Sequence, residues 1–351
     1  MNKFNNGIYE YTEYEEIHEK DYAKDIKELW IKDIGVVKEH SFSDLTNLEK
    51  VTIFGVSEIE EYAFIGCINL KDIHFDPSIK EIGDYAFAGC EKIEFLFLPT
   101  DLEVIGQFAF SNINSLKTIV LPDGLRIIGK SAFKSCISLE QIYIPKGVDE
   151  IQSNAFMDCK NVKKVIIDEN VKKIRSGAFN GMSNMNELII LSNEIKFDMG
   201  VFSNLYSLKK IMIDGPKIIN MFLLGNSGCL NVEEVTIGNY VSEIDSYAFS
   251  KFVSLKKIKI GKSVKKIGEY AFGSCISLSE IIIPENVKEI CDLAFSDCYN
   301  LNTVRIQSHQ TKLVKRCFNL CYFLKKIIVP KSYIIDYMSI TDLPYVEIFY
   351  E

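Results

Sequence analysis

The feature that most constrains this chain is a phenylalanine that recurs at a nearly constant interval of 23 residues. This phenylalanine is the last residue of short segments of the type YAF, such as EYAF at 61–64 and SYAF at 246–249. One long gap, from Phe202 to Phe249, holds a degenerate copy in which Asn226 takes the place of Phe. The recurring phenylalanines are residues 42, 64, 87, 110, 133, 156, 179, 202, 249, 272, 295 and 318. Thirteen copies of one unit therefore follow from Phe42 onward, which predicts a solenoid of stacked coils.

Each unit combines a short strand pattern with a compact turn. In the segment 142–144 two isoleucines flank one tyrosine, and this alternation predicts a strand with two side chains buried and one exposed. Such a strand is too short to be stable alone, so we expect strands of successive coils to pair in parallel. Pro145 ends the strand because proline cannot donate to the ladder. The spacing of Ile82, Ala86 and Cys90 predicts a short helical turn with one buried stripe.

A glycine precedes the phenylalanine by four residues in several units. In EIGDYAFAGC, residues 81–90, this glycine and the final cysteine could be read alone as a phosphate-holding turn or a reactive thiol. Gly83 and Gly106 occupy the same slot that Gln152 and Arg175 occupy in other units. Because the slot accepts side chains, we expect the glycine to serve a turn and not a phosphate.

The complete unit, L-x-x-I-x-I-P-x-x-V-x-x-I-G-x-x-A-F-x-x-C, resembles the BspA-like class of leucine-rich repeats over about residues 21–330. The resemblance implies an arc with a parallel β-sheet on its concave side, short helical turns on its convex side and a role in binding proteins. Val56, Gly124 and Gly147 stand where better-known leucine-rich repeats carry an asparagine ladder. We therefore expect the loops of this chain to arrange their hydrogen bonds differently.

We predict three parts along the chain. Residues 1–25 are acidic and rich in tyrosine and form an N-terminal cap, since a solenoid needs its terminal coils covered. Residues 26–330 form one leucine-rich repeat solenoid of about 13–14 coils. Residues 331–351 leave the repeat and form a C-terminal cap that closes with a strand at 345–350.

Eight of the ten cysteines stand three residues after the phenylalanine slot. Ile113, Met182, Leu205 and Phe252 fill that position in other units, so we interpret the cysteines as a stack of small buried hydrophobic residues. Disulfides between adjacent coils and a thiol metal site are the alternatives, although parallel side chains bridge poorly and no C-x-x-C pair is present. The eight are Cys67, Cys90, Cys136, Cys159, Cys229, Cys275, Cys298 and Cys321, with Cys291 outside the slot and Cys317 in the alanine slot.

Composition and the remaining candidates argue against several functions. The four histidines (His18, His40, His74 and His309) share no position in the repeat, so no catalytic pair stands out, and we expect no catalysis, cofactor or metal. A net charge of −8 disfavours a nucleic-acid partner. No apolar run reaches the roughly 18 residues of a membrane span, and the first residues lack a signal-peptide pattern. We expect no membrane insertion and a cytoplasmic location, with unconventional surface export as the alternative.

The outward residue of each strand gives the candidate site. Six consecutive coils carry an apolar residue there, and one further phenylalanine adds to them, whereas a solvated face should be polar. The predicted protein-binding residues are Phe95, Phe97, Val120, Tyr143, Ile166, Ile189 and Met212. The competing interpretation is that Ile, Val and Tyr simply favour strands. We thus expect a non-catalytic solenoid that binds a protein partner through its concave sheet face; a BspA-like surface antigen or adhesin that binds host or extracellular proteins is the alternative.

Overall fold

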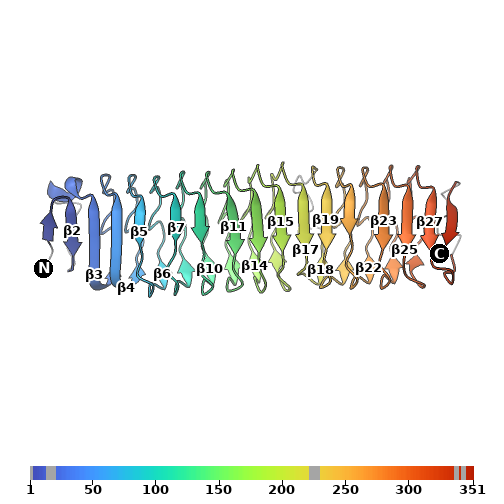
Figure 1. Ribbon diagram of the computed structural model, residues 1–351, viewed down its shortest axis with the longest axis horizontal. Helices are drawn as coiled ribbons and strands as arrows, with labels where there is room; N and C mark the ends of the chain where they lie inside the picture. Colours follow the sequence, from blue (N-terminus) through green and yellow to red (C-terminus); the bar gives the residue numbers. More distant parts are fainter. Residues whose placement is uncertain (1–2, 13–20, 221–229, 336–339, 341–344) are drawn as a thin grey trace. The chain divides into compact units, whose positions relative to one another are not determined.

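The computed structural model describes residues 3–12, 21–220, 230–335, 340 and 345–351, and it is built of stacked β-coils (Figure 1). The chain forms two compact units, one of Met1–Asn184 with Lys196–Val201 and one of Met185–Ile195 with Phe202–Glu351. Asn226 and Cys229 lie outside the described residues. A typical coil has a front strand of three or four residues, a back strand of two residues and a tight turn that leads into the next coil. The fold class is therefore a parallel β-solenoid.

In the first unit the front strands form one side of the coil and the back strands another. The front strands are β3 (Glu28–Val37), β4 (Lys50–Ile59), β5 (Asp72–His74), β7 (Phe95–Phe97), β9 (Thr118–Val120), β11 (Gln141–Ile144) and β13 (Lys164–Ile167). The back strands are β6 (Glu81–Ile82), β8 (Val104–Ile105), β10 (Ile127–Ile128), β12 (Glu150–Ile151), β14 (Lys173–Ile174) and β16 (Lys196–Phe197). The strands β1 (Lys3–Asn5) and β2 (Ile8–Tyr11) pair antiparallel and precede the single-turn 3-10 helix η1 (Asp21–Asp25).

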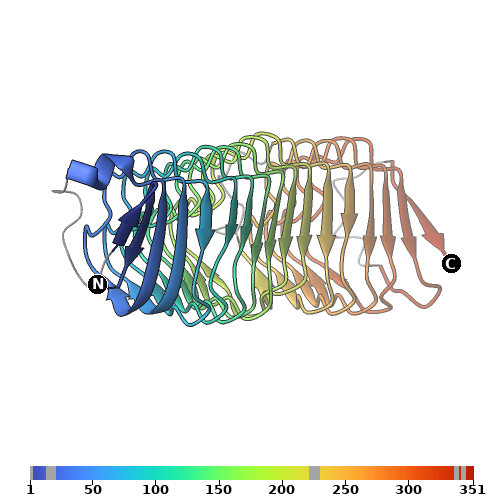
Figure 2. The same cartoon turned by 60° about the vertical axis from the view of Figure 1, so that its left-hand side comes forward.

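Two long strands, β3 and β4, belong to both sides of the coil, as Figure 2 shows in its blue part. The first half of β4 pairs with β5 on the front, and its last residues pair with β6 on the back. From β6 to β16 the back sheet is continuous and parallel. The front sheet is not, because β5 and β7 belong to different sheets, and so do β9 and β11.

The second unit repeats the same plan. Its front strands are β15 (Glu187–Ile190), β17 (Lys210–Ile213), β19 (Glu234–Ile237), β21 (Lys257–Lys259), β23 (Glu280–Ile283), β25 (Thr303–Ile306), β27 (Lys326–Val329) and β28 (Glu347–Tyr350). Its back strands are β18 (Ile218–Ile219), β20 (Glu243–Ile244), β22 (Lys266–Ile267), β24 (Glu289–Ile290) and β26 (Lys312–Leu313). The last strand, β28, pairs in parallel with β27 within the region expected to cap the chain.

The prediction of short helical turns is wrong. The segments around each phenylalanine are hydrogen-bonded turns, and η1 is the single helical element of the described residues. The residues two before and two after the phenylalanine adopt left-handed backbone conformations, as do Tyr85 (φ 57°) and Gly89 (φ 74°) on either side of Phe87. A left-handed residue cannot continue a right-handed helix. The turns of adjacent coils are instead joined by backbone hydrogen bonds, such as the one from the Phe87 N–H to the Ala109 carbonyl at 2.8 Å.

The core is made of two ladders that run from coil to coil. The phenylalanine rings stack face to face, with centroids 4.9 Å apart for Phe64 and Phe87 and 5.2 Å apart for Phe272 and Phe295. Next to them lie the cysteines of the predicted slot, which are free and buried wherever the structure describes them. The stack of small buried residues is thus confirmed for the described coils, and no disulfide joins these cysteines.

The glycine four residues before the phenylalanine was expected to serve a turn, but the structure gives a different reason for it. Gly83 and Gly106 do not adopt a left-handed conformation. A β-carbon on Gly106 would lie 2.6 Å from the backbone carbon of Gly83, one coil earlier, which is closer than real β-carbons approach any heavy atom. In these coils the glycine therefore allows two backbones to pass close to each other.

Candidate functional site

The strand register brings the predicted site residues of the first unit together in pairs. Phe97 lies opposite Val120 in the β7–β9 pair, and Tyr143 lies opposite Ile166 in the β11–β13 pair. Phe97, Tyr143 and Ile166 alternate with buried residues along their strands, and Val120 is the exposed residue of β9, so all four side chains point outward from the front strands. Phe95 lies on the same side of β7 as Phe97, two residues earlier. We call these five residues the front stripe.

The front stripe is well exposed for its apolar character. Phe97 is 65% exposed, Phe95 54%, Val120 49% and Tyr143 48%, while Ile166 is half-buried. In the second unit the remaining predicted residues, Ile189 and Met212, are register partners in the β15–β17 pair. Met212 is exposed and Ile189 is half-buried. The sequence therefore placed all seven outward, but Ile166 and Ile189 offer less surface than the others.

Tyr143 carries the polar contact of the front stripe. Its hydroxyl donates a hydrogen bond to Oδ2 of Asp168, which follows β13 on the next coil. This bond and a smaller effect of burial raise the pKa of Tyr143 to about 12, and the charges of Asp168 and Asp123 add to the shift. The ring is thereby fixed on the surface by one end, while its apolar edge stays exposed.

A groove opens at the first end of the front stripe, between β5 and β7. It has a volume of about 910 Å³, and its apolar lining is Ile73, Phe75, Phe95 and Phe97, with His74 among them. Charged residues of the lining are Lys71, Asp72, Lys92 and Glu94. The sequence identified Phe95 and Phe97 but missed the groove, because it gave no sign that the front sheet is interrupted here. We call this feature the β5–β7 groove.

Beside the front strands, oppositely charged side chains of adjacent coils form ion pairs. Lys71 lies 3.0 Å from Glu49, and Lys117 lies 2.7 Å from Glu94. The hydrogen bond and charge of Lys71 hold the pKa of Glu49 below its usual value. Exposed ion pairs of this kind contribute little to stability. We therefore interpret them as solvated contacts between adjacent coils and not as a binding site.

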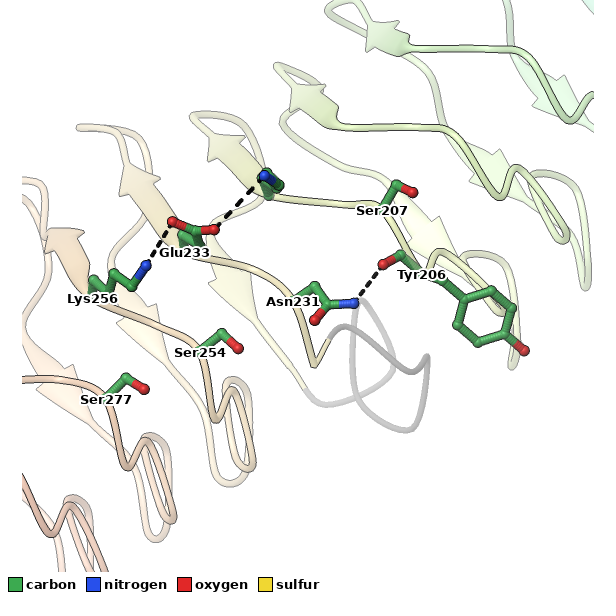
Figure 3. Close-up of a pocket in the computed structure, with 8 residues that line it drawn as sticks. Tyr206, Ser207, Asn231, Glu233, Ser254, Lys256 and Ser277 are labelled. Carbon is green, nitrogen blue, oxygen red and sulfur yellow. Dashed lines mark hydrogen bonds and ion pairs between the residues drawn. The ribbon is translucent and has the colours of Figure 1, made fainter.

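The second unit has a more polar groove, which Figure 3 shows in close-up. Its volume is about 400 Å³, and Ser207, Asn231, Ser254 and Ser277 line it one coil after another. Along one side Glu233 lies between two lysines, 2.9 Å from Lys256 and 3.9 Å from Lys209. Asn231 donates a hydrogen bond of 2.6 Å to the backbone carbonyl of Tyr206, whose ring points away from it. Asn231 and Glu233 therefore each tie one coil to a neighbouring one.

The sequence also missed an apolar ridge in the second unit. It occupies the position directly after the cysteine slot, where six consecutive coils carry an apolar residue. Its members are Tyr206, Leu230, Val253, Ile276, Tyr299 and Tyr322. Tyr322 is 72% exposed, and its ring stacks on Tyr299 with centroids 5.9 Å apart. The signal for this ridge is present in the sequence, as an apolar residue at the same repeat position in six consecutive coils.

Other candidate chemistry gains no support from the geometry. Among the residues that the structure describes, no group of three or more His, Cys, Asp or Glu side chains is arranged to hold a metal ion. Burial raises the pKa of the Cys67 and Cys136 thiols to about 12, which leaves them protonated near neutral pH. Within the described ranges, no helix is long and apolar enough to cross a membrane.

These features define a class of protein, a repeat solenoid whose coils stack through phenylalanine and cysteine ladders. The protein-family model described as BspA type leucine rich repeat region (6 copies) matches this sequence over residues 35–163, 103–227 and 217–342. Because these stretches cover most of the chain, it belongs to the BspA-type leucine-rich repeat family. No curated protein matches the chain.

Solved structures share the fold. A leucine-rich repeat protein from Bacteroides ovatus is 24% identical, with a TM-score of 0.53 over 93% of this chain and 84% of that one. A TLR13–ssRNA13 complex gives a TM-score of 0.52 at 17% identity, over 88% of this chain and 47% of that one. A leucine rich cell surface protein from Faecalibacterium prausnitzii is 25% identical, with a TM-score of 0.41 over 87% of this chain and 79% of that one. The first two likenesses establish the fold alone.

Proposed function

We propose that this chain is a non-catalytic protein-binding solenoid that holds a protein partner against the outward side of its front strands. The observation that carries the proposal is the front stripe of the first unit. Phe97, Val120 and Tyr143 expose about half or more of their side chains in coils that follow one another. Exposed apolar residues that gather in this way, with charged residues beside them, mark interfaces more often than isolated ones do.

Exposed aromatic residues suit this role energetically. Binding energy concentrates in a few aromatic side chains that become desolvated at the centre of an interface. Phe95, Phe97 and Tyr143 are such side chains, and the hydrogen bond to Asp168 orders Tyr143 before any partner arrives. Ordering in advance lowers the entropy that binding costs. In the second unit, Ile189 and Met212 form an outward pair of the same kind.

The proposal is tested by reversing the character of the front stripe. We expect the double variant Tyr143→Lys and Ile166→Lys to lose its partners in affinity capture from native lysate, with little change in melting temperature. Ile282→Lys is the matched control, since Ile282 has the same outward position in β23 and is 50% exposed. Equal recovery of every partner by the double variant would end the proposal. A large drop in melting temperature would place the two side chains in the core instead.

The second candidate, which the family resemblance also implies, is a surface antigen or adhesin that binds extracellular proteins. It would use the same face in another compartment. We propose a cytoplasmic location for the protein-binding solenoid, because buried free thiols favour a reducing compartment. Protease treatment of intact source cells separates the two, because a cytoplasmic chain survives and a surface chain is cleaved.

A further inference from the structure

The two strands beside the β5–β7 groove each have a hydrogen-bonding edge without a strand partner. β5 pairs with β4, where Val51 lies opposite Ile73, and β7 pairs with β9, where Leu96 lies opposite Ile119. Within residues 21–220, no strand pairing joins β5 to β7. The N–H and C=O groups of such an edge are those that a further strand satisfies.

The separation is confined to the front side of these two coils. On the back side β6 pairs directly with β8, with Ile82 opposite Ile105. In the turns, the rings of Phe64 and Phe87 stack 4.9 Å apart. The coils are therefore held at normal spacing on two sides while the third side is open. This arrangement makes the groove a fixed part of the fold.

The opening uncovers residues that belong to the core by their position. Ile73 and Phe75 are half-buried, although their equivalents one coil earlier, Val51 and Ile53, are 0% and 1% exposed. On the outward side the exposed rings of Phe95 and Phe97 extend the same apolar surface. An apolar side chain that entered the groove beside Phe75, Phe95 and Phe97 would cover apolar surface that the fold leaves in contact with water.

The charges around the groove are mixed. Lys71 and Glu94 already have partners, Glu49 and Lys117. Lys92 and Asp72 have no ion-pair partner among the described residues, so one positive and one negative charge remain. A rim of balanced charge suits the neutral backbone of a polypeptide better than a strongly charged polymer.

We propose that the β5–β7 groove binds an extended peptide segment of a protein partner. The segment adds its backbone to the free edge of β5 or β7 and inserts an apolar side chain between Phe75, Phe95 and Phe97. This assignment rests on the proposed function and names the partner chemistry at one end of the front stripe. Recognition by strand addition takes its affinity from main-chain hydrogen bonds and its specificity from the pockets that receive alternate side chains.

The experiment uses the full chain and linear peptides displayed on phage as the probe. Peptides selected on the chain are synthesised, and their Kd is measured by fluorescence anisotropy with the chain and with the double variant Phe95→Ala and Phe97→Ala. We expect the double variant to bind about a hundredfold more weakly, a factor of ten for each lost aromatic anchor. Ile282→Ala, at the same strand position in the second unit, should leave the Kd unchanged. Circular dichroism of both variants checks that the fold is intact.

Hydrogen exchange gives the second readout, because strand addition slows the exchange of backbone amides in β5 and β7, whereas a purely apolar contact does not. Selected peptides that bind the double variant as tightly as the original chain would overturn the proposal. So would bound peptides that leave exchange in β5 and β7 unchanged, or a groove that takes up only the apolar dye ANS. Peptides could also fail to bind the double variant Tyr143→Lys and Ile166→Lys yet still bind the double variant Phe95→Ala and Phe97→Ala. That result would support binding at Tyr143 and Ile166 and would overturn the assignment of the groove.

Discussion

The thiol of Cys67 donates a hydrogen bond to the backbone carbonyl of Phe42, one coil earlier, with 3.2 Å between Sγ and O. The same contact recurs from coil to coil. The other pairs are Cys90–Phe64, Cys136–Phe110, Cys159–Phe133, Cys275–Phe249, Cys298–Phe272 and Cys321–Phe295. The carbonyl of Phe64 also accepts the backbone N–H of Cys67 at 3.3 Å, so the thiol of Cys90 adds a second hydrogen bond that joins two coils. The thiol therefore does more in this slot than fill space.

Replacing Cys90 by alanine tests this double role. The variant loses the hydrogen bond to Phe64 and leaves a small cavity beside the phenylalanine ladder, since Cys90 is fully buried. We expect the free energy of unfolding to fall by about 1–3 kcal/mol, measured by urea denaturation. Cys291→Ala is the control, because Cys291 lies outside the slot and is half-buried. A loss for Cys90→Ala as small as that of the control, about 0.5 kcal/mol or less, would contradict the role.

The buried thiols also predict a loss of stability at alkaline pH. Burial raises the pKa of Cys67 and Cys136 from 9.0 to about 12. Above pH 9 the unfolded chain releases these protons and the folded chain keeps them, so stability is present below that pH and falls as the pH rises toward 12. Each such thiol contributes a slope of about 1.4 kcal/mol per pH unit. Urea titrations across this range should show a shallower slope for Cys136→Ala. Rapid alkylation of Cys136 in the folded chain near pH 9 would contradict the raised pKa.

The repeat unit predicted the front strands well, because the alternation of side chains along a strand fixes which residues point inward and which point outward. The alternation around Tyr143 fixed which residue points outward, and the parallel register with Ile166 followed from the constant period. The same reasoning failed for the turns. Ile82, Ala86 and Cys90 have the spacing of a helical stripe, but Tyr85 and Gly89 take left-handed conformations between them, and spacing alone does not reveal backbone handedness.

The β5–β7 groove could not be predicted, because it depends on a strand pairing that does not form. Both coils carry a normal strand pattern, with Ile73 and Leu96 in the inward position. Whether two such strands meet depends on the path of the whole coil. The front stripe was predictable as a set of outward side chains; its interruption at Phe95 was not.

Tyr143 and Asp168 give a prediction about the front stripe itself. The hydrogen bond to Asp168 is the largest cause of the raised pKa of Tyr143, about 12 against an ordinary value of 10.0. Asp168→Asn should therefore return the pKa toward 10, because the charged acceptor is removed. NMR titration of ring-labelled tyrosine, with the signal assigned from Tyr143→Phe, measures the change. Asp123→Asn should have a smaller effect, since Asp123 acts only through its charge. A pKa that stays near 12 in Asp168→Asn would show that the bond is not the cause.

Alanine substitutions of Gly89 and Gly106 distinguish the cost of backbone strain from the cost of steric contact. Gly89 has a φ of 74°, and an added β-carbon would meet no atom within 4 Å, so Gly89→Ala should cost about 1 kcal/mol from strain alone. Gly106 has an ordinary φ, but its β-carbon would lie 2.6 Å from the backbone of the preceding coil. Gly106→Ala must push two coils apart, and we expect a loss of about 2 kcal/mol or more. Urea denaturation measures both losses, and hydrogen exchange should show added opening near Gly83 only in Gly106→Ala. Equal losses with equal exchange patterns would mean that close coil approach is not what Gly106 provides.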